Sequence, residues 1–196
     1  MDSIRDLAIQ VDSDLGFRSH VRYVSKTSKR LINLCFKMFT ACHLDTFLSF
    51  YKLYVLPIIA YNSSIYSLVS ISNINQLEKI QRYFSKRLYI RLYHKTLIPN
   101  YVDRLALFHL DPLEVYLIKK DLCILYRLSN GPLEVPGVNV IRSPHLPARL
   151  QISSVRTSLY RSFFLHRTIM IWNKCLSYKN FASFGQFKSF IDELHP

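Results

Sequence analysis

The stretch from Tyr51 to Leu92, YKLYVLPIIAYNSSIYSLVSISNINQLEKIQRYFSKRLYIRL, decides the fold. In its second half, apolar residues recur at steps of three and four, the spacing that places side chains on one face of an α-helix: Ile74, Leu77, Ile80, Phe84 and Leu88. Cations lie between these positions, on the flanks and back of the helix, and Glu78 alone opposes them. We therefore predict a helix with a buried face and a basic back.

The composition indicates a folded, mostly helical chain. Hydrophobic residues make up 49% of the 196 residues, enough for a sizeable core. Only four glycines accompany 13 Phe and 13 Tyr, which favours helices over a sandwich or barrel. We expect a mainly α protein: a helical bundle with a short N-terminal β strand or hairpin and a small C-terminal satellite unit.

Local signals place the elements. Leu7, Ile9 and Val11 alternate with polar or small residues, which predicts a strand before a turn at Asp12-Ser13-Asp14. Helix starts are predicted from capping residues at Ser19, at Asp45, at Ser72 or Asn75 with Glu78, at Asp111-Pro112, and at Ser183 with Gln186. Pro57 predicts a kink or an end, and Asn130-Gly131 predicts a stop. A short helix is expected after Pro99.

These elements predict four segments. Residues 1–18 form a strand and turn, and residues 19–130 form the helical domain. Residues 131–158 contain four prolines without periodicity and are expected to be a linker. Residues 159–196 form an aromatic-rich helical unit.

The charge points to an anionic partner. The net charge is +13, and Arg18 to Lys37 holds six cations without an acid. Nucleic acid is the first candidate, and an acidic membrane surface is the second. The residues predicted to contact phosphates lie on two helices: Arg22, Lys26, Lys29, Arg30, Lys79, Arg82, Lys86, Arg87 and Arg91. The simpler interpretation is a solvated helix surface.

An apolar segment supports a different class of function. Leu53 to Ile74 carries no charge over 22 positions, which is long enough to cross a bilayer. Pro57 and several Ser and Asn residues interrupt it, and Lys52 and Lys79 flank both ends without a positive-inside bias. A small membrane-associated helical protein anchored by this segment is therefore the alternative.

Catalytic and metal motifs are sparse. Metal-assisted phosphoryl or nucleotidyl transfer needs clustered carboxylates, and the nearest approach, Asp12 and Asp14, fits a turn better. Cys35, Cys42 and His43 lack the paired spacing of a zinc site. The four cysteines, the other two being Cys123 and Cys175, are predicted to be free thiols in a reducing compartment. No catalytic residue, metal site or cofactor is predicted.

Three blocks resemble the reverse transcriptases of non-LTR, LINE-type retrotransposons, especially the jockey-like elements, in the region after the polymerase palm. RDLAIQVDSDLGFRSHV is similar to the segment that leads from palm to thumb. In the strongest block, residues match the family patterns Y-x-x-x-V-x-P-x-x-x-Y and I-x-x-L-E-x-x-Q-R: Tyr51, Val55, Pro57, Tyr61, Leu77, Glu78, Gln81 and Arg82, with Tyr66 where tryptophan is usual. The third block comprises DRLALFHLDPLEVYLIKKDLCILYRLSNG and RTSLYRSFFLHRTIMIWNKCLSYKNFASFGQFKSFI. These stretches are similar to the family's distal helices and to its Trp-Asn segment, which is Trp172-Asn173 here.

The resemblance implies a thumb-like module that holds template RNA and primer DNA through their backbones, without reading sequence. The family's catalytic aspartate pair, which uses Mg²⁺, belongs to a palm that this chain lacks. The expected function is thus a non-catalytic fragment of an RNA-directed DNA polymerase, intracellular in the nucleus or cytoplasm, with the missing palm as a further partner. A remnant of a decayed element, without function, is the other alternative.

Overall fold

The computed structural model describes residues 3–40, 43–66, 70–94, 97–131, 140, 149–151, 157, 161, 163–176, 179 and 181–193. The chain divides into two compact units, Met1–Glu114 and Val115–Pro196. Helices dominate both, which confirms the predicted mainly α class. The division falls after Glu114, within the domain expected to end at residue 130, and most of the predicted linker 131–158 lies outside the described residues.

The N-terminus is an antiparallel hairpin of β1 (Ser3–Asp6) and β2 (Ile9–Asp12), in which Asp6 pairs with Ile9. The alternating pattern placed Leu7 within a strand. That prediction is wrong, because Leu7 and Ala8 form the loop with positive φ angles of 41° and 67°. The turn predicted after Asp12 is present, and a carboxylate oxygen of Asp12 accepts a hydrogen bond from the Ser19 amide at 3.2 Å.

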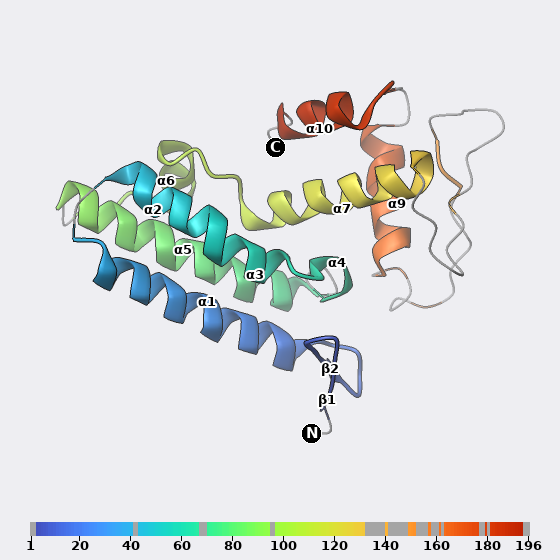
Figure 1. Ribbon diagram of the computed structural model, residues 1–196. Helices are drawn as coiled ribbons and strands as arrows, with labels where there is room; N and C mark the ends of the chain where they lie inside the picture. The colour runs from blue at the N-terminus through green and yellow to red at the C-terminus, as the bar shows by residue number, and fades with distance from the viewer. Residues whose placement is uncertain are drawn as a thin grey trace. The chain divides into compact units, whose positions relative to one another are not determined.

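Three long helical segments form the first unit. α1 (Arg18–Met38) and α5 (Ile71–Tyr93) run in the same direction, and a helical rod packs against both in the opposite direction (Figure 1). The rod consists of α2 (Leu44–Phe50), the π-helical turn η1 (Tyr51–Val55) and α3 (Leu56–Ala60). The short helices α4 (Ser63–Tyr66) and α6 (Tyr101–Leu107) complete the unit.

Pro57 explains the break in the rod. Proline has no amide to donate and its ring clashes with the carbonyl four residues earlier, so the preceding turn must adjust. The amide of Leu56 donates to the carbonyl of Tyr51, five residues back, which is the hydrogen bond of a π turn. α3 then ends at Ala60. Within the described residues, no helix is both long enough and apolar enough to cross a membrane.

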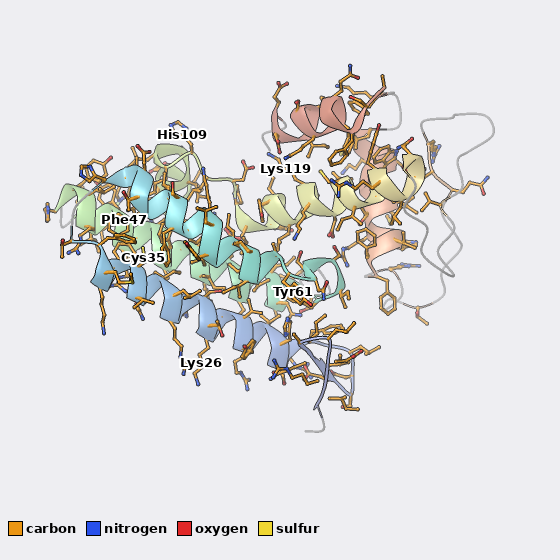
Figure 2. All side chains as sticks on the ribbon, viewed as in Figure 1. Lys26, Cys35, Phe47, Tyr61, His109 and Lys119 are labelled. Atoms are coloured by element: carbon orange, nitrogen blue, oxygen red, sulfur yellow. The ribbon has the colours of Figure 1, made fainter. Side chains whose placement is uncertain are left out.

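Aromatic residues fill the core of the first unit. The ring of Tyr51 stacks on that of Phe84 at 4.2 Å, and Phe36 stacks on Phe47 at 4.8 Å. Figure 2 shows Cys35 and Phe47 directed between the helices. The predicted buried face of α5 is confirmed by four residues, Leu77, Ile80, Phe84 and Leu88, whereas Ile74 is half-buried.

The helices of the second unit are α7 (Leu113–Asn130) from Val115 onward, α9 (Phe164–Cys175) and α10 (Phe184–Glu193). Tyr126 and Trp172 pack on Phe187, with ring centroids 4.5 and 5.4 Å from it. Because Tyr126 and its neighbours Leu122 and Leu125 belong to this core, α7 is part of the C-terminal unit. The side chain of Asn173 exchanges two hydrogen bonds, at 2.9 and 2.8 Å, with the backbone of Leu150.

The expected starts at Ser19 and Asp45 are wrong, because α1 begins at Arg18 after Phe17 and α2 begins at Leu44 after His43. Other helix ends follow the predicted signals. The short helix expected after Pro99 is α6, whose cap is Asn100, and α7 ends at Asn130, where the Gly131 amide donates to the Arg127 carbonyl. The Ser183 hydroxyl accepts from the Gln186 amide at 3.3 Å, as expected of the last cap. The start of α5 differs from both predictions. Its cap is Ser70, which accepts from the Asn73 amide at 3.2 Å, rather than Ser72 or Asn75.

Candidate nucleic-acid interface

The four predicted cations of α1 are exposed. Arg22, Lys26, Lys29 and Arg30 follow one another at steps of four, three and one, so they share one side of the helix. The opposite side carries the buried residues Val21, Val24 and Ile32. Figure 2 shows the side chain of Lys26 extending away from the neighbouring helices. We call the four cations the α1 stripe.

Three cations of α5 are exposed in the same manner. Lys79, Arg82 and Lys86 are spaced by three and four residues, which places them along one side of the helix. The guanidinium of Arg82 lies 4.6 Å from the ring centre of Tyr101, a cation–π contact that restrains this side chain. We call these three residues the α5 stripe.

Arg87 and Arg91 have a different environment. The Nη1 atom of Arg87 donates to the Asn33 side-chain oxygen and, at 2.9 Å, to the Tyr83 hydroxyl, which itself donates to Asn33 at 2.6 Å. Arg91 donates to the carbonyls of Phe36 and Phe39 at 3.2 and 3.0 Å. These carbonyls lie at the C-terminal end of α1, where the positive charge of an arginine interacts favourably with the helix dipole. Both arginines are half-buried and tie α5 to α1.

The Asn33–Tyr83–Arg87 network brings the two stripes together. Lys29 and Arg30 lie four and three residues before Asn33, so they are its neighbours on α1. Lys79 and Lys86 lie four residues before and three after Tyr83 on α5. The α1 stripe therefore lies on one side of the network and the α5 stripe on the other. The sequence alone did not predict that the two stripes lie next to each other.

The negative charge of Glu78 lies in the interior and not on the surface that carries the stripe cations. The sequence placed it among the cations, but it is 8% exposed and turned inward. It accepts hydrogen bonds from the Tyr101 hydroxyl and, at 3.3 Å, from the Leu113 amide. Burial, with the contact to Glu78, raises the pKa of the Tyr101 hydroxyl. α1 contains no acid, and the ion pairs of the described residues, Arg18–Asp14 and Arg167–Asp121, include none of the seven stripe cations.

The acids near the N-terminus have structural roles. Asp14 accepts from the Gly16 amide at 3.0 Å and pairs with Arg18. Burial raises the pKa of Asp12, but hydrogen bonds from Ser19 and the charge of Arg18 outweigh it, so the pKa lies below its usual value. These contacts agree with the predicted turn. Among the residues that the structure describes, no group of three potential metal ligands occurs.

The thiols differ in their surroundings. Cys35 is buried, and burial raises its pKa to about 11, so the thiol stays protonated at neutral pH. Cys123 is half-buried and Cys175 is exposed, and neither forms a disulfide. Cys42, one of the three residues considered as ligands of a zinc site, lies outside the described residues.

Residues that the sequence did not single out carry part of this surface. Asn33, Tyr83 and Phe36 hold the two helices together. The guanidinium carbon of Arg87 lies 4.7 Å from the centre of the Phe36 ring. The Tyr83–Arg87 pair has the i, i+4 spacing of a helix contact and was detectable in principle. Asn33 lies 50 residues from Tyr83, a pairing that no local pattern reports.

The chain is similar to a protein of Caenorhabditis elegans. The uncharacterized protein B0403.1 from Caenorhabditis elegans is 25% identical over 142 residues, which cover 72% of this chain and 71% of that protein. No protein-family model matches the chain. No solved structure matches it either.

Proposed function

We propose that this chain is a non-catalytic, thumb-like module of a LINE-type reverse transcriptase, which holds RNA and DNA through their phosphates. The observation that carries the proposal is the pair of exposed basic stripes on either side of one network, whose cations form no ion pair with a carboxylate of the described residues. The resemblance of three sequence blocks to that family supports it. Phosphate contacts of this kind bind nucleic acid without reading its sequence.

We propose that seven of the nine predicted cations contact phosphates, because these seven residues are exposed to solvent. They are Arg22, Lys26, Lys29 and Arg30 of the α1 stripe and Lys79, Arg82 and Lys86 of the α5 stripe. Arg87 and Arg91 bond to α1, so their first role in the proposal is to fix the spacing between the stripes. The partner strands are the template and primer of the reverse transcriptase.

The proposed role needs no cofactor on this chain. In the resembling family, Mg²⁺ is held by the palm, and the palm is the proposed protein partner. The proposal places the chain inside the cell, in the nucleus or the cytoplasm, where nucleic acid is present and free thiols are stable.

Salt dependence tests the proposal. Each phosphate contact with duplex DNA contributes a slope of about −0.9 to the plot of log affinity against log salt. If all seven stripe cations make contact, the slope is about −6 for a duplex, and about −5 for a single strand. Filter binding or fluorescence anisotropy at several salt concentrations measures the slope.

Charge variants sharpen the test. The triple variant Lys26→Gln, Lys29→Gln, Arg30→Gln is expected to reduce the slope by about three, one for each lost phosphate contact. The matched control is Lys52→Gln, Lys174→Gln, Lys188→Gln, which removes the same charge from exposed positions outside α1 and α5. A flat salt response of the unmodified protein, or an equal loss in the control, would contradict the proposal.

A further inference from the structure

A pocket opens at the end of the α1/α5 pair, beyond the last cation of the α5 stripe. It has a volume of about 220 Å³ and is lined by Phe36, Arg87, Ile90 and Arg91. Apolar atoms form most of the lining, and the pocket is open to solvent on one side. The guanidinium of Arg87 lies over the Phe36 ring, 4.7 Å from its centre, and both this charged group and the apolar side chain of Ile90 border the pocket.

The pocket continues the basic surface. Ile90 is 42% exposed and lies four residues after Lys86, one helical turn further along the α5 stripe. Phe36 lies three residues after Asn33, at the same end of the network on α1. A strand whose phosphates contact the stripes therefore passes the mouth of this pocket.

The lining selects one kind of group. Pockets for whole small ligands have volumes of roughly 300–1,000 Å³, so this one is sized for part of a larger ligand. Guanidinium planes stack on nucleobases, and an apolar wall such as that of Ile90 excludes water from the stacked faces. The two arginines also attract the phosphate attached to the base.

We propose that this pocket binds a single unpaired base of a nucleic-acid strand held on the α1 and α5 stripes. The inference rests on the proposed function and adds a preference to it. In a duplex every base is paired and stacked, so only a single strand or an overhang presents a base to the pocket. The stripes then bind single and double strands, whereas the pocket binds only the former.

A pocket variant tests the preference. Ile90→Ser removes the apolar wall and leaves the Asn33–Tyr83–Arg87 network intact. Stacking of a base contributes enough that its loss lowers affinity by about fivefold or more. The variant is expected to lower affinity for a single-stranded oligonucleotide by that factor and to leave the affinity for its duplex unchanged. Anisotropy titrations at one salt concentration give both values.

Two controls separate the base from the backbone. Ile71→Ser makes the same substitution at a 79% exposed position at the other end of α5, and it should change neither affinity. A strand of equal length with abasic residues keeps the phosphates but lacks the bases. The unmodified protein should bind it as weakly as Ile90→Ser binds the intact strand.

The outcomes distinguish the two proposals. If binding depends on salt as proposed but Ile90→Ser binds the single strand normally, or loses single and double strands equally, the base pocket is refuted and the basic surface stands. If the unmodified protein binds neither nucleic acid, both proposals fail. Circular dichroism of each variant checks that the helices remain folded.

Discussion

At the scale of single residues, burial separates ionizable side chains that look alike in the sequence. Lys86 and Arg87 are adjacent, yet the first is exposed and the second is held by Asn33 and Tyr83. Glu78 has the spacing of a surface acid but accepts hydrogen bonds in the interior. A charged group inside a protein needs such partners, because desolvation without them is costly. The exposed cations are therefore the proposed phosphate contacts, whereas the bonded cations hold α5 against α1.

His20 predicts a pH dependence at this scale. It is buried against the Tyr66 ring, 4.5 Å away, and its Nδ1 atom accepts a hydrogen bond from the Gln10 amide. Burial lowers the pKa of His20 below its usual value of 6.5. Between that value and the lower folded-state pKa, the unfolded chain binds more protons than the folded protein. Stability is therefore full above pH 6.5 and falls as the pH drops through this window.

Denaturant unfolding at pH 7.5 and pH 5 measures this effect. The unmodified protein is expected to have a lower unfolding free energy at the acidic pH, and His20→Gln, which cannot protonate there, should reduce the difference. His109→Gln is the control, since His109 is exposed and its loss should leave the difference as it is. Equal pH dependence in the unmodified protein and His20→Gln would exclude His20 as the cause.

At the scale of elements, backbone requirements explain where strands and helices stop. Pro57 turns one predicted helix into α2, a π turn and α3, because it removes a donor from the middle of the rod. The β1–β2 loop is a second case. Leu7 and Ala8 both have positive φ, the pattern of a type I′ turn, which favours Asn-Gly over side chains of this kind.

The hairpin loop gives a stability prediction. Leu7→Asn with Ala8→Gly relieves the backbone strain and is expected to raise the free energy of unfolding by up to about 1 kcal/mol. Chemical denaturation measures the change. Ile4→Asn serves as the control, because it removes an exposed apolar residue from β1 without changing a positive φ. The interpretation of the loop would be overturned if the double variant were less stable than the unmodified protein.

At the scale of the whole molecule, each unit has its own aromatic core. Phe36, Phe47, Tyr51 and Phe84 form that of the first unit, and the cluster around Phe187 forms that of the second. All nine predicted phosphate contacts lie in the first unit. The proposed nucleic-acid binding therefore belongs to Met1–Glu114, which also contains the Gln81 hydrogen bond to the Asp111 carbonyl at 2.7 Å and the Glu78 bond to Leu113.

A fragment tests this assignment. Residues 1–114 are expected to unfold cooperatively and to keep the salt slope of the full chain within about one contact, because both stripes and their core are retained. Circular dichroism melting and anisotropy titration measure these properties. A fragment that folds but loses most of the salt slope would move the phosphate contacts to the second unit.

The sequence by itself determined the helical class, the buried face of α5, the short helix after Pro99, the cap at Ser183 and the stop at Asn130, since each depends on periodicity or on a few neighbouring residues. It also identified the exposed cations of both stripes. Only the tertiary structure decided that Glu78 turns inward, that Arg87 and Arg91 bond to α1, and that a pocket forms beside Phe36. Those features join residues about 20 to 55 positions apart, and local spacing carries no information on which helices pack together.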